Sequence, residues 1–561
     1  MTKEIKQRQV NTAVKHQLVE AGISPLLANL YAARGVNNAQ ELELTLNHII
    51  PPSQLTNSTA MAELLADAIA EDKKILVVGD YDADGATATA VAVKGLLGMG
   101  AQVDFLVPNR FEYSYGLTPE IVQLAATMQP DVIITVDNGI ASVEGVAAAN
   151  KCGILVLITD HHLPGDTTPE AACIVNPNQQ GCDFSSKNLA GVGVMFYVLL
   201  ALRAVLRSRK AFAEKPEPNL TALLDLVALG TVADLVKLDA NNRILVEQGL
   251  RRIRADACCF GISALLKVAG RDQAKVNAQD LGFYVGPRLN AAGRLDDMRL
   301  GIQCLLADTE QIALKIAQSL HDLNAERRSI ETSMQDEALA SLEEIKVGSQ
   351  YSISLYEPSW HQGVVGILAS RIKGQYHRPV IAFAEVGEGL LKGSGRSISG
   401  LHLRDALDLV TKRNPDLIIT FGGHAMAAGL SIAQENFSDF QQAFESVVRE
   451  LLTPADLQEV IETDGGFDVA EMTLDTAQAL TSQVWGQGFA PPLFSDQFSV
   501  INQRIVGKKH SKLLLEKQDK RFDAIFFGHV DDLPKQIEAV YQLQVNHYNG
   551  TQSVQLQLLH V

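Results

Sequence analysis

The stretch KILVVGDYDADGATATA, from Lys74 to Ala90, decides how the first half of this chain folds. Its apolar opening is typical of a buried strand, and its small-residue end is typical of a helix. Between the two lie three acidic residues at alternate positions, Asp80, Asp82 and Asp84. Carboxylates this close repel one another and destabilise a fold unless an opposite charge holds them. The stretch therefore predicts a strand, a ligand-binding loop and a helix, in that order.

The alternation of short apolar runs with helical segments continues to about Val175. Three more apolar runs follow, AQVDFLVP, DVIITVD and ILVLITD. The segments TPEIVQLAATM and SVEGVAAANKC lie between them, and Thr118 with Pro119 is a typical helix start. Strand, helix and strand at this spacing predict βαβ units, and therefore an α/β fold with a parallel sheet and helices on both of its faces.

Acidic residues end three of the predicted strands. These are Asp80, Asp137 and Asp160, and the last is followed at once by His161 and His162. Ligands of an open parallel sheet gather beyond the carboxyl ends of its strands, so these side chains are expected to meet. A single strand-end aspartate is more often a helix cap or a turn former. Three independent strand ends with a histidine pair favour a metal site instead, because a cation removes the repulsion.

The donor types decide which metal suits such a site. Carboxylates with imidazole and no thiolate favour Mn²⁺ or Mg²⁺, and the histidines favour Mn²⁺ of the two. The acids outnumber what one ion needs, which indicates two ions that share a bridging carboxylate. Paired ions activate a water and hold both oxygens of an in-line phosphoryl displacement. The predicted reaction is therefore hydrolysis of a phosphoester or a phosphoanhydride.

The rest of the chain divides into further parts, since 561 residues are too many for one hydrophobic core. Residues 191–306 read as mainly helical, and residues 308–345 predict a long, charged connecting helix without glycine or proline. Residues 351–452 return to an α/β pattern. The last hundred residues alternate apolar and polar side chains in about five strands, which fits a small closed barrel such as an OB-fold. We expect a catalytic domain with an N-terminal extension at 1–306, the connecting helix at 307–347, a second α/β domain at 348–453 and the barrel at 454–561.

Composition and charge limit the class of protein. The chain is 47% hydrophobic and 20% charged, as soluble globular proteins are. Its net charge of −17 argues against a generally basic DNA-coating protein, although a local basic groove is compatible with it. The six cysteines show no CxxC spacing, so we expect reduced thiols and no zinc site. The N-terminus is polar, and the most apolar run, 191–206, contains Arg203 and is expected to fall short of a membrane span. These features predict a cytoplasmic protein with no membrane contact.

Eight motifs carry a resemblance to a known family. GDYDADGATATA, TVDNGI, TDHHLPG and LGTVADLVKL resemble the four ligand-bearing motifs of the DHH phosphoesterase superfamily. GPRLNAAGRLDD, WHQGVVGILASR, KGSGRSI and GGHAMAAG resemble its nuclease branch and the DHH-associated domain. The resemblance extends over nearly the whole chain. It implies a DHH-type parallel-sheet catalytic domain, a long connecting helix, a DHH-associated α/β domain and a C-terminal OB-like barrel.

The resemblance also implies a role for individual residues. Two ions, Mn²⁺ or Mg²⁺, would be held by Asp80, Asp82, Asp84, Asp137, His161 and Asp234. Asp137 is expected to bridge the ions, His162 to face the scissile phosphate and Asp160 to orient a histidine. Together with His161 these three form the expected catalytic group. From the residues alone, Asp234 could equally be an exposed helix acid.

Phosphate-binding residues are expected where basic or hydroxyl side chains lie in glycine-rich contexts. There the backbone can approach a phosphate and a guanidinium can chelate it. A lone arginine or lysine is more often a solvated surface charge. The expected residues of the two α/β domains are Arg110, Arg288, Arg294, Ser394, Arg396, Gly422, Gly423 and His424. In the barrel, Lys508, Lys509 and Lys512 form a basic patch suited to a single-strand backbone.

The resemblance implies a metal-dependent exonuclease that hydrolyses single-stranded DNA from 5′ to 3′ to mononucleotides, in DNA recombination and repair. The expected partners are single-stranded DNA, a single-strand-binding protein and a helicase, and the expected state is a monomer. Two alternatives stay open. A small-molecule or oligonucleotide phosphohydrolase of the superfamily would use the same ions, but has no need of the connecting helix and the barrel. A non-catalytic, single-strand-binding replication scaffold would be expected to have lost ligands, and here every ligand position is filled.

Overall fold

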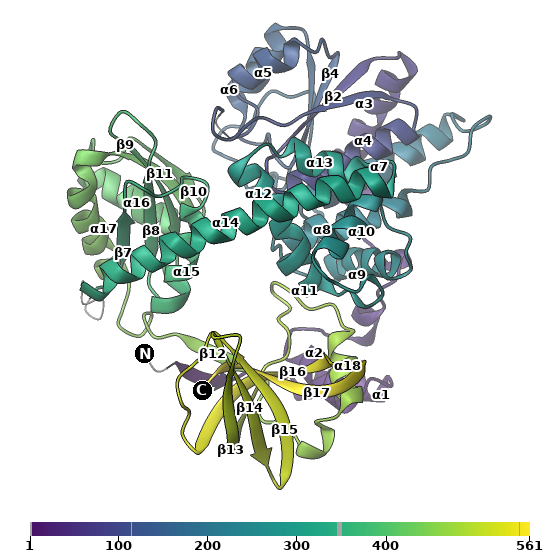
Figure 1. Ribbon diagram of the computed structural model, residues 1–561. Helices are drawn as coiled ribbons and strands as arrows, with labels where there is room; N and C mark the ends of the chain where they lie inside the picture. Colours follow the sequence, from purple (N-terminus) through teal and green to yellow (C-terminus); the bar gives the residue numbers. More distant parts are fainter. Residues whose placement is uncertain (1–2, 114, 345–349, 549) are drawn as a thin grey trace. The chain divides into compact units, whose positions relative to one another are not determined.

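The computed structural model describes residues 3–113, 115–344, 350–548 and 550–561 (Figure 1). The chain forms two compact units. The first comprises residues 7–322 and 463–561, and the second comprises residues 1–6 and 323–462. The first unit contains a parallel sheet and a closed barrel, and the second contains a mixed sheet.

The parallel sheet follows the predicted alternation. Its strand order is β3-β2-β4-β5-β6, and the strands are β2 (Lys74–Gly79), β3 (Gln102–Leu106), β4 (Val132–Val136), β5 (Leu155–Thr159) and β6 (Cys173–Val175). Every residue of β4 is buried, as expected of a parallel strand that is covered on both faces. Leu76 and Val78 pack toward α5 (Pro119–Ala126) and α6 (Val143–Lys151) on one face. The other face is covered by α3 (Ser58–Ala70), α4 (Ala83–Gly98) and α7 (Gly191–Ser208) (Figure 1).

Local start signals in this domain act as predicted. The Thr118 side chain accepts the N–H of Ile121 at the start of α5, and Pro119 occupies the first helical position. Outside the sheet layers, residues 7–306 also form α1 (Thr12–Glu20), α2 (Pro25–Ala32), α8 (Leu224–Ala233), α9 (Ala240–Arg254), α10 (Phe260–Val268), α11 (Ala278–Asp280), α12 (Gly286–Leu295) and α13 (Arg299–Leu306). The region 191–306 is therefore mainly helical, as the sequence predicted.

Helix α7 corrects one expectation. It has 18 residues, and among the described helices it is the one that is long and apolar enough to cross a membrane by length and composition. Arg203 therefore does not shorten it below that limit. However, 67% of its apolar window is buried inside the protein, where it packs against α3, α4 and α8. Its apolar character is explained by its place in the core.

The long connecting helix is confirmed as α14 (Glu310–Glu344), which has 35 residues (Figure 1). Its predicted end at residue 345 lies outside the described residues. In the second unit, Glu331 of this helix is 5% exposed and pairs with Arg327 and with Arg371, both at 2.7 Å. A buried carboxylate with two guanidinium partners fixes this half of α14 to the helix that carries Arg371.

The mixed sheet of the second unit has the strand order β10-β11-β9-β8-β7. Its elements are β7 (Ile353–Tyr356), α15 (Val365–Tyr376), β8 (Val380–Glu385), β9 (Leu390–Arg396), α16 (Leu403–Arg413), β10 (Thr420–Gly423), β11 (Ala427–Ala433) and α17 (Phe437–Leu451). β7 and β8 are parallel, and the other pairs are antiparallel. Two short strands, β1 (Glu4–Gln7) and β12 (Val460–Thr463), form a separate sheet.

The C-terminal strands close into a barrel, as predicted (Figure 1). α18 (Leu474–Thr481) precedes them, and the strands are β13 (Phe494–Val506), β14 (His510–Lys517), β15 (Lys520–Phe527), β16 (Gln536–Tyr548) and β17 (Thr551–His560). The barrel order is β13-β14-β15-β17-β16, in which β15 and β17 run parallel. A five-stranded barrel of this kind, with one parallel pair among antiparallel ones, has the architecture of an OB-fold. The predicted fold class is confirmed in each of its parts.

Candidate active site

The loop after β2 is shaped by its own acids. Asp80 is the first residue beyond the strand, and its Oδ1 accepts the N–H of Tyr81 at 2.7 Å. Asp82 is the N-cap of α4, where its Oδ1 accepts the N–H groups of Asp84 and Gly85 at 2.9 and 3.0 Å. Capping of a helix N-terminus, the ordinary role of an aspartate at this position, thus accounts for one oxygen of Asp82.

Asp84 is bound by the start of another helix. Its Oδ2 and Oδ1 accept the N–H groups of Gly191 and Val192, the first residues of α7, at 2.6 and 3.0 Å. The positive end of that helix partly offsets the buried negative charge. Gly191 also allows a close approach, because a Cβ at this position would lie 2.5 Å from the Cβ of Asp137. No role was predicted for Gly191 from the sequence, where it is simply the first residue of the apolar run 191–206.

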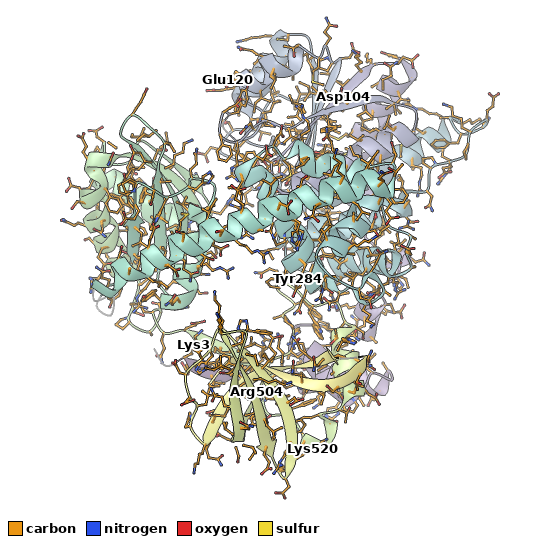
Figure 2. The ribbon with its side chains drawn as sticks, in the orientation of Figure 1. Lys3, Asp104, Glu120, Tyr284, Arg504 and Lys520 are labelled. Atoms are coloured by element: carbon orange, nitrogen blue, oxygen red, sulfur yellow. The ribbon has the colours of Figure 1, made fainter. Side chains whose placement is uncertain are left out.

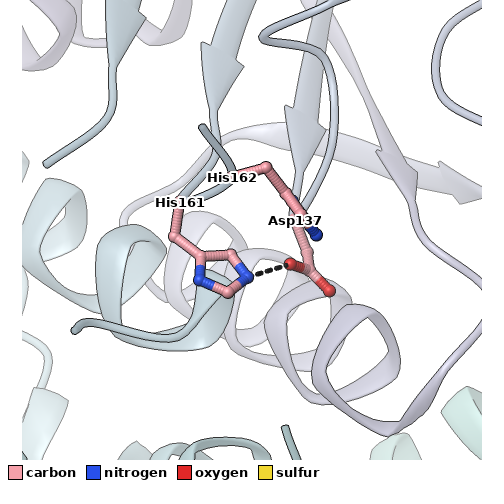
Figure 3. Close-up of side chains that lie close together, drawn as sticks. All are labelled: Asp137, His161 and His162. Carbon is pink, nitrogen blue, oxygen red and sulfur yellow. Dashed lines mark ion pairs between the residues drawn. The ribbon is translucent and has the colours of Figure 1, made fainter. Parts of the chain in front are cut away.

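Asp137 lies at the centre of the cluster. It follows β4 with a φ of +62°, a conformation that non-glycine residues rarely adopt, and it is 2% exposed. Its Oδ1 lies 3.1 Å from Nε2 of His161 (Figure 3) and accepts no hydrogen bond from any described residue. The neighbouring Asn138 donates to the carbonyls of Val78 and Val136, which ties the ends of β2 and β4 together. A buried carboxylate oxygen held without a donor is a suitable cation ligand.

Asp160 and His162 form a close pair. Asp160 Oδ1 accepts the N–H groups of His161 and His162 and lies 2.8 Å from Nδ1 of His162, while Oδ2 accepts the N–H of Ile140. Burial is the largest single influence on Asp160 and raises its pKa, but the hydrogen bond and charge of His162, the N–H of Ile140 and the charge of His161 together leave the pKa below its usual value. Burial lowers the pKa of His162, but the bond to Asp160 and the surrounding acids raise it to about 9. Asp160 and His162 therefore form a close pair in which Nδ1 of His162 faces the carboxylate.

Asp234 completes the cluster from the end of α8. It is the C-cap of that helix, and its Oδ2 lies 3.5 Å from Nε2 of His161. A negative charge at a helix C-terminus is disfavoured by the helix dipole, so its placement there needs another reason. His161 also lies 4.0 Å from Oδ2 of Asp84. The structure thus brings Asp234 to the other acids, which the sequence pattern alone could not decide.

Three groups of donor atoms in this cluster could each hold a metal ion. They are Asp80 with Asp82 and Asp137; Asp84 with His161 and Asp234; and Asp137 with His161 and His162, each with its donor atoms within 4.8 Å of one another. Burial first, and repulsion between the carboxylates second, raise the pKa values of Asp80, Asp137 and Asp234 well above their usual range. The same causes raise the pKa of Asp84 to about 7. Divalent cations would remove this penalty, and oxygen and imidazole donors without thiolate fit Mn²⁺ or Mg²⁺.

Two residues of the GPRLNAAGRL motif support the acidic loop. Asn290 Oδ1 accepts the N–H of Ala83 at 2.8 Å. A Cβ on Gly293 would lie 2.0 Å from the carbonyl oxygen of Tyr81, so only glycine allows α12 to approach this closely. A third supporting residue is Tyr115, whose hydroxyl donates to the carbonyl of Asp137 at 3.1 Å. The GPRLNAAGRLDD motif was identified in the sequence, but no role was predicted for Asn290, Gly293 or Tyr115.

The predicted phosphate ligands of the first unit fall into two places. The Arg110 guanidinium lies 4.6 Å above the ring of Tyr81, and its charge acts on Asp80. The charge of Arg294 acts on the same tyrosine, so both arginines lie beside the acidic loop. Arg288 is 6% exposed and bonds instead to the carbonyl of Tyr284 and to Nδ1 of His321. A phosphate role for Arg288 therefore stays a prediction.

The predicted ligands of the second unit meet at one end of its sheet. Arg396 ends β9 and pairs with Ala427 of β11, while Gly422 and Gly423 end β10 and His424 begins the connection from β10 to β11. Arg396 Nη1 donates to Oγ of Ser394 at 3.2 Å, and a Cβ on Gly366 in the first turn of α15 would lie 2.8 Å from that Oγ. Burial lowers the pKa of Arg396, and no carboxylate of a described residue pairs with it. A half-buried guanidinium, a hydroxyl and a helix N-terminus together favour a phosphate group.

The predicted barrel patch is also assembled. Lys508 and Lys509 are exposed in the β13–β14 turn, and Lys512 lies on β14 opposite Arg504. Cross-strand neighbours share a face of the barrel, so Arg504 adds a fourth cation that the sequence analysis did not name. None of the three lysines pairs with an acid among the described residues.

Comparison with known proteins gives a consistent result along the chain. Three family models match in succession: the DHH family N-terminal domain at residues 74–231, the DHHA1 domain at 348–450 and the RecJ OB domain at 463–560. The single-stranded-DNA-specific exonuclease RecJ of Salmonella typhimurium is 50% identical over 98% of both chains. RecJ of Escherichia coli is 49% identical over 99% of this chain and 98% of its own.

Solved structures give the same result. The structure of RecJ from Thermus thermophilus in complex with Mn²⁺ matches with a TM-score of 0.83 at 29% identity, over 99% of this chain and 79% of that chain. The Mg²⁺ complex of the same protein matches with a TM-score of 0.76 at 27% identity, over 99% and 78% of the two chains. The two relatives are 50% and 49% identical to this chain over nearly its whole length, and the acid and histidine cluster lies at the expected strand ends. This chain therefore belongs to the RecJ family of DHH proteins.

Proposed function

We infer that this chain is a metal-dependent exonuclease specific for single-stranded DNA. One observation carries the inference: a complete Asp and His cluster lies within a chain that matches single-stranded-DNA-specific exonucleases over 98% of their length. The finer proposal is that digestion runs from 5′ to 3′ and yields mononucleotides, in DNA recombination and repair.

Two ions are proposed for the metal centre. When bound, divalent ions supply Lewis-acid chemistry at the phosphate and at the attacking water. Asp137 belongs to two of the three donor groups, which supports its role as the bridge between the ions. Asp80, Asp82, Asp84, His161 and Asp234 supply the remaining donors. The solved Mn²⁺ and Mg²⁺ complexes of RecJ support either metal.

The other residues bind and orient the substrate. Asp160 holds Nδ1 of His162, so the imidazolium can carry a proton on Nε2 toward a phosphate oxygen. Arg110 and Arg294 lie beside the acidic loop, where they can hold the phosphates next to the cleaved bond. We propose that Ser394, Arg396 and residues 422–424 bind the 5′-terminal phosphate, and that the barrel lysines bind the backbone further along.

The remaining assignments are proposals of the same kind. We keep the division into a catalytic region at 1–306, a connecting helix at 307–347, a DHH-associated domain at 348–453 and a barrel at 454–561. The protein is proposed to be a cytoplasmic monomer whose partners include a single-strand-binding protein and a helicase. A phosphohydrolase of small molecules or short oligonucleotides is less well supported, because a closed barrel with a basic hairpin has no use there.

The substrate and its polarity can be tested together. Long single-stranded DNA, a blunt duplex and a dinucleotide would be digested side by side in Mn²⁺, with the label at either end of the DNA. We expect rapid loss of the single strand, release of a 5′ label as a mononucleotide and resistance of the duplex. Arg396→Ala should weaken the preference for a 5′-phosphate over a 5′-hydroxyl end, and Arg404→Ala, an arginine of α16, is the matched control. Preferred hydrolysis of the dinucleotide would support the alternative.

A further inference from the structure

Large apolar side chains are exposed beside the metal centre. Leu235, which follows the candidate ligand Asp234, is 67% exposed, and Phe283 and Tyr284 are 75% and 39% exposed. The last two lie in a π-helical turn, Leu281–Val285, between α11 and α12. Turns of this kind are rare and often mark functional sites. Figure 2 labels Tyr284 on this segment.

The π-helical turn packs directly on the helix end that carries Asp234. A Cβ on Gly282 would lie 3.2 Å from Cγ1 of Val232, and one on Gly286 would lie 3.2 Å from the Cβ of Ala233. These contacts place the turn that carries Phe283 and Tyr284 against the two residues that precede Asp234 and Leu235. The apolar patch and the metal centre therefore share the same end of α8.

Two arginines hold Tyr284 in place. Arg288 donates to the carbonyl of Tyr284 at 2.5 Å, and its guanidinium also contacts His321. The guanidinium of Arg271 lies 4.5 Å over the ring of Tyr284 and is held in turn by Asp280 at 2.6 Å. A fixed aromatic surface beside a cation can bind a flat, weakly polar group and the anionic chain attached to it.

Leu235 is in a conformation that its side chain does not favour. Its φ is +59°, in the left-handed region where a helix usually ends on glycine. Leu235 is both strained and exposed, so neither the backbone conformation nor packing in the core explains why a leucine occupies this position. Strain of this kind is concentrated at sites that bind ligands.

We propose that Leu235, Phe283 and Tyr284 form a stacking platform for a nucleobase of the single-stranded substrate, next to the nucleotide held at the metal centre. The inference rests on the proposed function and adds a base-binding subsite to it. Stacking on an aromatic ring suits a nuclease that accepts any sequence, because every base presents a π face. It also disfavours a duplex, whose bases already stack on each other.

Binding without metal tests the platform separately from catalysis. The probe is a fluorescent 5′-phosphorylated oligothymidylate in EDTA, and a series of the same oligonucleotide carries one abasic residue at each position in turn. Phe283→Ala should weaken binding by roughly 5- to 150-fold, the range for loss of one base–aromatic stack. An abasic residue at one position near the 5′ end should weaken wild-type binding similarly, and should add nothing to Phe283→Ala.

Leu235→Gly separates function from folding. Glycine suits the left-handed position, so this variant should unfold at the wild-type temperature and still bind the oligonucleotide more weakly. Leu97→Ala is the matched control, because Leu97 is 54% exposed and lies about 20 Å along α4 from Asp84. It should bind as the wild type does.

The outcomes distinguish this inference from the proposed function. A flat abasic series, or equal abasic penalties in wild type and Phe283→Ala at every position, would overturn the platform while digestion of single-stranded DNA continued. Retention of wild-type affinity by Phe283→Ala would do the same and would indicate a protein partner for the patch. A wild type that binds but does not digest single-stranded DNA in Mn²⁺ would contradict the proposed function and leave the stacking result intact.

Discussion

Gly191→Ala tests whether the metal centre depends on the close approach of α7 to Asp137. The added Cβ would lie 2.5 Å from the Cβ of Asp137 and 2.6 Å from its Oδ1, whereas ordinary contact begins at 3.4 Å. Either the start of α7 or the Asp137 side chain must therefore move by about 0.9 Å. Asp137 is buried and already in a left-handed conformation, so it has little freedom to adapt. The start of α7 cannot move without changing its bonds to Asp84.

The expected effect follows from this displacement. Metal–ligand distances tolerate shifts of about 0.2 Å, so a change several times larger should weaken the site. We expect the affinity for Mn²⁺ to fall by about 10- to 100-fold or more, as for the loss of supporting residues around other metal ligands. Overpacking should also lower the free energy of unfolding by about 1–3 kcal/mol. Calorimetric titration of Mn²⁺ into the variant measures the first effect, and denaturant unfolding measures the second.

Gly193→Ala is the matched control, two residues further along the same helix. Its Cβ would meet only the tip of the Leu189 side chain, at 3.2 Å, which can give way. This variant should bind Mn²⁺ like the wild type. If Gly191→Ala bound Mn²⁺ with wild-type affinity, the contact between α7 and Asp137 would not shape the metal centre.

Three further predictions concern proton, metal and DNA binding. His162→Ala should still bind Mn²⁺ in calorimetry but should hydrolyse DNA about 10- to 100-fold more slowly; loss of Mn²⁺ binding would make His162 a ligand, and full activity would remove its role. The raised pKa values of Asp80, Asp84, Asp137 and Asp234 mean that the folded protein binds more protons than the unfolded chain. Stability of the metal-free protein should therefore fall as pH rises from about 4 through 7, and Mn²⁺ should raise the melting temperature more at pH 8 than at pH 5; a melting temperature independent of pH would contradict this. Changing Lys508, Lys509 and Lys512 together to Ala should flatten the log–log salt dependence of oligonucleotide binding by about two units, at about 0.7 per phosphate contact; an unchanged slope would make the lysines plain surface charge.

The strand ends of the metal centre could be predicted because their signals are local. A parallel strand that is buried on both faces is a nearly continuous apolar run, so its last residue is visible in the sequence. Asp80, Asp137 and Asp160 were placed in this way, and the rule for parallel sheets then brought them together. The long helix and the barrel strands were equally visible, since their periodicity extends over many residues.

The features of the site that could not be predicted from the sequence depend on contacts between distant segments. The bonds from Gly191 to Asp84 and from Ala83 to Asn290 join residues more than a hundred positions apart, and no local pattern reports them. Asp234 caps a helix whose end has no periodic signal of its own. From the sequence, α7 was expected to be too short and too polar to span a membrane. Its apolar length is explained instead by burial against the helices packed around it, which no local pattern reports.

The most direct test of the central claim is single-turnover digestion of end-labelled single-stranded DNA by the wild type and by Asp137→Ala, in Mn²⁺ and in EDTA. The acid and histidine cluster on β2, β4, β5 and α8 is predicted to be the only centre of hydrolysis. The wild type should therefore release mononucleotides in Mn²⁺ and none in EDTA, and Asp137→Ala, which removes the proposed bridging ligand, should be inactive although it still binds the DNA. Digestion by Asp137→Ala at the wild-type rate, or digestion by the wild type in EDTA, would contradict the account.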